Sequence, residues 1–223
     1  MPPPAFVAFA QNHDQVGNRA LGERIVRLAD TGRLRALMAC ILLAPQVPLL
    51  FMGEEFAAST PFLFFCDLGP ELADAVTRGR REEFARFARF STPSARQAIP
   101  DPTATSTFQA SKLDWNEAQQ PAGAQWRAFY RRCLALRGQH IVPLLGGLRG
   151  SGTFSVEHDA LLRVEWSGIG GRLHLIANLG DAPRSDVAMP AGEVVFATDG
   201  MPPPDRRADI PRDGVAFTRE ERA

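Results

Sequence analysis

The residues best suited to chemistry lie directly after an apolar run near the start of the chain. Phe6–Ala10 is predicted to be a strand, and Asn12, His13, Asp14 and Gln15 follow it. Strands of a parallel barrel are fixed by packing while their carboxyl ends face a cleft, so active-site groups stand there. An ionised Asp14 accepts hydrogen bonds from two neighbouring sugar hydroxyls, and His13 donates or accepts according to its tautomer. These residues predict a clamp for a sugar ring. The alternative is a His–Asp hydrogen bond that ties down a loop.

A second set of charged residues could support this clamp. The apolar run Val47–Met52 is predicted to be a buried strand, and the adjacent carboxylates Glu54 and Glu55 come just after it. Successive side chains point in different directions, so these two carboxylates are not expected to share a proton. They are predicted to lie in the cleft or behind the groups that touch the ligand. Arg19 and Arg24 could steady Asp14 or line the cleft, but solvent-facing positions are the preferred interpretation for both. Arg19 is kept as a candidate substrate contact.

The elements that must position these groups follow from the hydrophobic pattern. Between the two strands, apolar residues recur at helical spacing from residue 28 to residue 42, and Ala44-Pro45 marks a stop. A strand, a helix and a second strand form a right-handed crossover with parallel strands. Further helices are predicted over Arg80–Phe90 and Asn116–Arg137.

The stretch from Glu54 to Gly79 is long and irregular, which is typical of a lid or a functional insertion. It carries a group of phenylalanines, Phe56, Phe62, Phe64 and Phe65. Aromatic rings of this kind could stack on sugar faces, but a buried cluster is the preferred interpretation.

Beyond Gly146-Gly147 the period changes from helical to alternating, with short apolar runs separated by Gly, Pro and Asp. This pattern predicts an antiparallel β-sandwich. The strands are predicted at residues 153–156, 160–166, 172–179, 187–189, 193–197 and 214–218. We therefore expect an α/β part over residues 1–147 and an all-β domain over residues 148–223.

Composition narrows the function classes. The 25 basic and 25 acidic residues balance, so no broad positive field attracts nucleic acid. Cys40, Cys66 and Cys133 have no paired spacing, and the histidines are scattered, so neither a zinc site nor a disulfide framework is predicted. No glycine-rich phosphate loop appears, and no cofactor is expected. The start of the chain lacks the features of a secretory leader, so a cytoplasmic location with no membrane partner is expected.

Several segments together resemble a known family. Phe6–Gln15, continued by residues 16–19, resembles the segment after the seventh barrel strand of the alpha-amylase superfamily of glycoside hydrolases, and Val47–Glu55 resembles the eighth strand of that superfamily. Three further segments are similar to the malto-oligosyltrehalose trehalohydrolase family within it. They are residues 59–67, 79–84 and 108–115.

The resemblance implies the last two strand-helix units of a (β/α)8 TIM barrel, followed by the β-sandwich. It also implies that Asp14 is the third catalytic carboxylate, which stabilises the transition state, and that His13, Asn12, Gln15 and Arg19 bind substrate. The nucleophilic Asp and the acid/base Glu of the family match no segment of residues 1–223.

The implied activity is hydrolysis, with retention, of the α-1,4 bond next to the terminal trehalose of a malto-oligosyl-trehalose. The implied partners are a malto-oligosaccharide-type substrate and an N-terminal polypeptide of the same enzyme that carries the two other carboxylates. The chain alone is expected to be inactive. The alternatives are a non-catalytic carbohydrate-binding or vestigial protein, and another starch-active member of the superfamily.

Overall fold

The computed structural model describes residues 1–221, and the chain divides into two compact units that do not follow chain order. One unit contains residues 1–10, 29–49 and 128 onward, and the other contains residues 11–28 and 50–127. The predicted boundary after residue 147 divides the chain into two continuous segments. The two compact units are instead each assembled from segments that are separated in sequence. The boundary therefore stays a prediction.

The first unit begins with the predicted crossover. After a 3-10 turn at Pro3–Ala5, strand β1 (Val7–Ala8) pairs in parallel with β2 (Val47–Pro48), with Val7 opposite Val47. The parallel pairing was predicted, and each strand is only two residues long. The N–H of Val47 donates to Phe6 O (3.0 Å) and the N–H of Leu49 to Ala8 O (2.9 Å), on either side of Pro48. Two strands do not make a barrel, so the (β/α)8 barrel itself stays a prediction.

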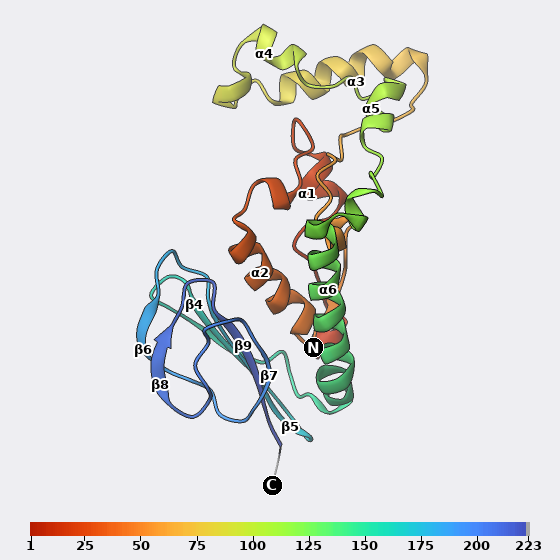
Figure 1. The fold of residues 1–223 in the computed structure, drawn as a ribbon. Coiled ribbons are helices and arrows are strands. Elements are labelled where there is room, and N and C mark those ends of the chain that lie inside the picture. Colours follow the sequence, from red (N-terminus) through yellow and green to blue (C-terminus); the bar gives the residue numbers. More distant parts are fainter. Residues whose placement is uncertain (222–223) are drawn as a thin grey trace. The chain divides into compact units, whose positions relative to one another are not determined.

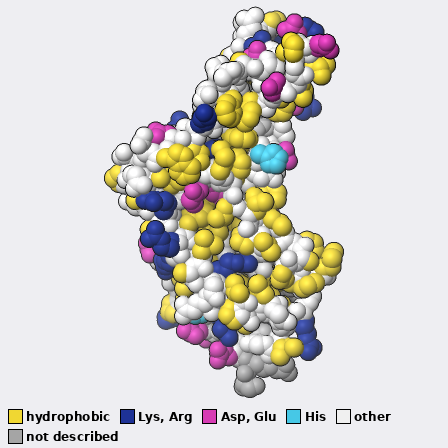
Figure 2. Space-filling view, turned by 90° about the vertical axis from the view of Figure 1, so that its right-hand side faces the viewer, with side chains coloured by type: hydrophobic (Ala, Val, Ile, Leu, Met, Phe, Trp, Pro, Cys, Tyr) yellow, Lys and Arg dark blue, Asp and Glu magenta, His cyan; other side chains and the backbone are white. Residues whose placement is uncertain are grey.

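Apolar side chains on and beside these strands remain exposed. Strands of a parallel barrel are normally covered on both faces, so this surface is unusual for them. The exposed residues are Phe6, Val7, Phe9, Val47 and Leu49. Figure 2 shows hydrophobic side chains gathered in patches on one face of the molecule.

The helix between the strands is α2 (Thr31–Leu43), which buries most of its apolar residues. It begins at Asp30, whose carboxylate accepts from the N–H of Gly32 (2.9 Å) and of Arg33 (3.2 Å). Its carboxyl end is held by Arg137, a buried arginine that donates to the carbonyls of Leu42 and Ala44 and to that of Gln46 (2.7 Å). Burial lowers the pKa of Arg137, and these carbonyls satisfy the cation in place of water.

Arg137 follows α6 (Pro121–Leu136), which corresponds to the long helix predicted over residues 116–137. The chain continues through a π-helical turn (Arg137–Ile141) and a 3-10 helix (Val142–Gly147) to the strand-rich part. Residues 117–119 form a separate 3-10 turn, because Pro121 fits only the first turn of a helix.

The strand-rich part confirms the predicted antiparallel sheet. It consists of β3 (Thr153–Glu157), β4 (Leu161–Gly168), β5 (Gly171–Asn178), β7 (Glu193–Ala197) and β9 (Val215–Glu220), in the order β3-β4-β5-β9-β7. A second, two-stranded sheet pairs β6 (Arg184–Ala188) with β8 (Arg207–Ile210) (Figure 1).

One apolar cluster joins the two sheets. Leu161, Ile176 and Ala216 come from the larger sheet, and Val187 and Ile210 from the smaller one. Strand β8 was not predicted, since only its last residue is strongly apolar.

The second unit is built from short helices and turns: α1 (His13–Gly17), 3-10 turns at Ile25–Arg27, Glu54–Phe56 and Ala88–Phe90, and α3 (Pro70–Glu83), α4 (Pro93–Gln97) and α5 (Thr105–Ala110). The predicted helix over residues 80–90 is misplaced. Helix α3 starts at Pro70, after Gly69 with φ 80°, and Phe84 ends it. The first turns of α3 were not predicted, because its sequence is mostly polar and has no clear helical spacing of apolar residues.

In the first unit, Arg33 ties the start of α2 to two loops of the β-domain. Its Nε donates to Asp213 Oδ1 (2.5 Å), and its Nη2 donates to Gly180 O and to Asp181 Oδ1 (both 3.0 Å). Hydrogen bonds with these two carboxylates raise the pKa of Arg33. This cluster is a polar connection between α2 and the loops that follow β5 and β8.

We expect Asp213→Asn to destabilise the first unit. Asp213 has φ 58°, a conformation that Asn tolerates, so the change removes charge without adding backbone strain. Loss of a partly buried charged hydrogen bond should lower the free energy of unfolding by about 1 kcal/mol. The measurement is urea denaturation followed by circular dichroism. Asp205→Asn is the control, because Asp205 is exposed and has φ 60°. Equal midpoints for the two variants would contradict the role given to Arg33.

Candidate functional site

The predicted clamp lies at the start of α1. Asn12 is the N-cap: its Oδ1 accepts from the N–H of Asp14 (2.7 Å), while Gln15 Oε1 accepts from the N–H of Asn12 (3.0 Å). These reciprocal bonds form a capping box and explain why the helix begins here. His13 Nε2 lies 3.4 Å from Asp14 Oδ1, and the side chains of His13 and Asp14 are 70% and 65% exposed. Both groups are therefore open to a ligand.

The other predicted substrate-binding residues, Asn12, Gln15 and Arg19, interact with other groups of the protein. The side-chain oxygens of Asn12 and Gln15 hold the helix start, so these residues orient the His–Asp pair. Arg19 is exposed, and its Nε lies 3.3 Å from Glu23 Oε2. A role in binding substrate stays a prediction for all of these residues.

A buried polar node directly precedes the clamp in sequence, and its central residue, Gln11, was not among the predicted site residues. Gln11 is 3% exposed; its Nε2 donates to Glu54 Oε2 (3.3 Å), and its Oε1 accepts from the N–H of Ile25 (3.1 Å). Gln11 thus links three loops through a single side chain. Glu54 is buried beside it and Glu55 is half-buried, so of the two predicted carboxylates it is Glu54 that reaches the residues just before α1.

Arg24 is the centre of this region. It is 1% exposed; its Nε donates to Thr60 O and its Nη1 to Met52 O, both at 2.7 Å, and its guanidinium lies 5.0 Å from the ring centre of Phe51. Burial lowers its pKa, and the carboxylates of Glu54, Glu55 and Glu117 oppose the shift. The prediction that Arg24 faces solvent is wrong, because its partners are backbone carbonyls that no sequence pattern reveals.

A second buried arginine holds the other end of α1. Arg80, on α3, donates from Nη2 to Gly17 O (2.8 Å) and to Arg19 O (3.0 Å), and pairs with Glu83 at 3.1 Å. It also lies 4.9 Å from the ring centre of Phe64. Sequence analysis did not single out this role, although Arg80 falls in one of the segments that carried the family resemblance. Helix α3 is thus fixed to the helix that bears the clamp.

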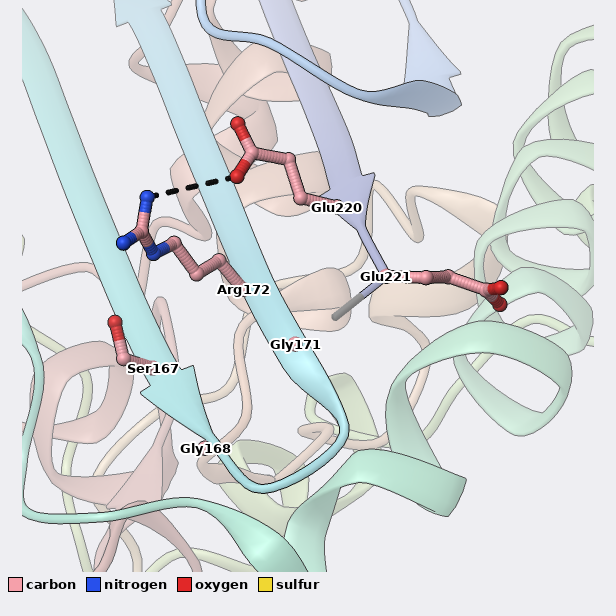
Figure 3. A pocket seen from close by; sticks show the side chains of 6 residues that line it. All are labelled: Ser167, Gly168, Gly171, Arg172, Glu220 and Glu221. Carbon is pink, nitrogen blue, oxygen red and sulfur yellow. Dashed lines mark ion pairs between the residues drawn. The ribbon is translucent and has the colours of Figure 1, made fainter. Parts of the chain in front are cut away.

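The rest of the described chain contains a pocket among the β-strands, but neither a metal-binding cluster nor a membrane-spanning helix. A pocket of about 420 Å³ lies between the β4–β5 hairpin and the end of β9; Figure 3 shows Arg172 in it pairing with Glu220, at 3.6 Å. Within residues 1–221, no cluster of three or more His, Cys, Asp or Glu side chains could hold a metal ion. No helix in the same range is long and apolar enough to cross a membrane.

Known proteins match both parts of the chain. Residues 149–217 match a family described as Domain of unknown function (DUF3459). The malto-oligosyltrehalose trehalohydrolase of Deinococcus radiodurans is 42% identical over 182 residues, which is 82% of this chain and 29% of that protein. The enzyme of the same name from Brevibacterium helvolum is 40% identical over 201 residues, which is 88% of this chain and 32% of that protein. Over these lengths the chain is similar to proteins named malto-oligosyltrehalose trehalohydrolase. It spans about a third of the length of these relatives.

Solved structures also resemble the chain in fold. A protein from Salmonella typhimurium, provisionally described as an alpha amylase, is 40% identical and superposes with a TM-score of 0.89 over 99% of this chain and 36% of that one. A trehalose-6-phosphate hydrolase of Bacillus licheniformis superposes with a TM-score of 0.59 at 16% identity, over 97% of this chain and 43% of that one, and shows the fold alone.

We expect Arg24→Ala to destabilise the protein strongly. The change removes two buried hydrogen bonds and leaves Met52 O and Thr60 O without that donor. Disrupting a buried charged network of this kind costs about 3 kcal/mol of unfolding free energy. Urea denaturation followed by tryptophan fluorescence measures the loss. The matched control is Arg27→Ala, an exposed arginine three residues away, which should change stability by less than about 0.5 kcal/mol. Similar losses in both variants would show that Arg24 does not organise the region.

Proposed function

We propose that this chain is the C-terminal part of a retaining glycoside hydrolase that cleaves the α-1,4-glucosidic bond next to the terminal trehalose of a malto-oligosyl-trehalose. The observation that carries the proposal is the 42% identity over 182 residues to an enzyme named malto-oligosyltrehalose trehalohydrolase. Identity at this level to several proteins of the same name favours that substrate over other starch-type substrates.

Asp14 has the chemistry that the proposal asks of it. Its carboxylate is exposed, is oriented by a capped helix, and stands beside an imidazole. Hydrogen bonds from sugar hydroxyls to such a carboxylate strengthen as the ring approaches an oxocarbenium ion, so they lower the barrier more than they tighten substrate binding. In this proposal Asp14 stabilises the transition state and His13 binds the same sugar ring.

Asp14 does not complete the reaction alone. A retaining glycosidase needs a nucleophile and an acid/base whose carboxyl groups lie about 5 to 5.5 Å apart on either side of the bond. In the proposal, both groups belong to a polypeptide that corresponds to the part of the relatives outside the match. The exposed apolar side chains of β1 and β2, Val7 and Val47 among them, are a surface on which its barrel strands would pack.

A chimera tests the proposal. The unmatched N-terminal part of the Deinococcus radiodurans relative is fused ahead of residues 1–223, and trehalose release from maltotriosyl-trehalose is measured. We expect the fusion to release trehalose. Asp14→Asn should reduce kcat by about 10²- to 10³-fold, the range seen when one preorganised electrostatic contact is lost.

The chain contains a matched control for that variant. His158 and Asp159 are also adjacent, but they lie in the turn between β3 and β4, and Asp159 has φ 64°, which Asn tolerates. Asp159→Asn should leave kcat unchanged. If the fusion with Asp14→Asn is as active as the fusion with Asp159→Asn, Asp14 is not a catalytic carboxylate. If a folded fusion binds maltotriosyl-trehalose without cleaving it, the function is binding.

A further inference from the structure

A pocket in the second unit has a composition suited to a sugar and lies apart from the clamp residues. Its volume is about 580 Å³. Two loops and the start of α5 line it. The lining residues are Phe65, Cys66, Asp67, Pro102, Thr103, Ala104, Thr105 and Phe108. We propose that this pocket is a distal subsite that binds one glucosyl unit of a neutral malto-oligosaccharide.

The pocket offers the two kinds of contact that a pyranose needs. Phe65 and Phe108 supply aromatic surface, with ring centres 5.2 Å apart and planes inclined at 67°. The exposed Asp67 supplies a carboxylate that accepts from two hydroxyls, and Thr103 and Thr105 add smaller polar groups. The lining therefore combines aromatic surface with polar groups, as a sugar ring with apolar faces and hydroxyl edges requires.

The polar groups of one wall are held by their neighbours. Asp101 Oδ1 accepts from the N–H of Thr103 (2.9 Å) and from the hydroxyl of Thr77 (2.7 Å), and these bonds lower the pKa of Asp101, that of Thr103 having the larger effect. Thr107 donates to Asp101 O (2.5 Å), and the N–H of Cys66 donates to Pro102 O (2.9 Å). The two loops are therefore joined before any ligand arrives, so little ordering is required on binding.

A row of aromatic rings connects this pocket to α1. The ring of Phe62 lies 3.6 Å from the position that a Cβ on Gly17 would occupy, so Phe62 packs on the last residue of α1. Phe62 and Phe65 have ring centres 5.6 Å apart, and Phe65 contacts Phe108. The pocket thus stands at the far end of a packed row that begins at the helix bearing the clamp. The ligand class rests on the proposed function.

Alkylation of Cys66 can report whether a ligand occupies the pocket. Cys40 and Cys133 are buried, and burial raises the pKa of each thiol to about 12, so neither forms the thiolate that alkylation requires. Cys66 is half-buried in the pocket wall. Iodoacetamide should therefore label Cys66 selectively, and peptide mass spectrometry gives the rate of labelling.

We expect maltotetraose to slow the labelling of Cys66 in the full chain. Phe108→Ala removes the more exposed ring, and should raise the concentration of maltotetraose needed for half-protection by about tenfold, equivalent to about 1.4 kcal/mol. Phe87→Ala is the matched control: Phe87 is 46% exposed against 43% for Phe108, and each ring has a cation above it, but Phe87 lies outside the pocket. Its half-protecting concentration should equal that of the unchanged protein.

Asp67→Asn is a second variant, at an exposed position where the fold is retained, and it should also weaken protection. Labelling that maltotetraose does not slow, or protection that is the same in Phe108→Ala and Phe87→Ala, would overturn the subsite. These results are separable from those of the chimera. Trehalose release by the chimera without protection of Cys66 rejects the subsite and retains the proposed function. Protection without trehalose release rejects the hydrolase and retains a saccharide site.

Discussion

The buried charge of Arg24 is the constraint on which the candidate site depends. A guanidinium that is 1% exposed has lost nearly all of its water, so its cost must be offset by fixed acceptors. Met52 O and Thr60 O provide two of them, and the ring of Phe51 lies against the cation. Each partner comes from the segment after β2, whereas Arg24 comes from the segment after α1. The two loops must therefore adopt one relative position for the cation to be buried at all.

Gln11 extends this constraint to the clamp. It precedes Asn12 directly, and its amide bridges Glu54 and the N–H of Ile25. The carboxyl end of α1 is fixed by Arg80 in the same manner, through backbone carbonyls. A helix of five residues has no stability of its own in water, because helix nucleation is unfavourable. Its position is set by these contacts at both ends, which leave His13 and Asp14 exposed yet oriented. Preorganisation of this kind is what an electrostatic role in catalysis requires.

The sequence predicts those helices and strands that are encoded by neighbouring residues. The parallel pairing of the two short strands, helix α2, most of α6 and the antiparallel sheet all follow from hydrophobic period and from turn residues. Strand β8 and the start of α3 were missed, since both are polar segments whose stability comes from packing elsewhere in the fold. The burial of Arg24 and Arg80 could not be predicted for a related reason. Their partners are backbone carbonyls, up to 63 residues away in sequence. Every residue has a backbone carbonyl, so the residue types do not indicate which one accepts the bond.

The arrangement also explains why a distal subsite would be useful to this fold. In the proposed function, Asp14 is held by a short helix on a loop-rich unit, and a small displacement of the sugar ring would weaken its interaction with the transition state. Binding energy from a remote part of the substrate can be used to hold the reacting ring in place, and truncated substrates then lose rate as well as affinity. The aromatic row from Phe62 to Phe108 connects the two places, because each ring in it contacts the next. A malto-oligosaccharide held at both ends of that row would have its ring beside Asp14 fixed by contacts that never touch the cleaved bond.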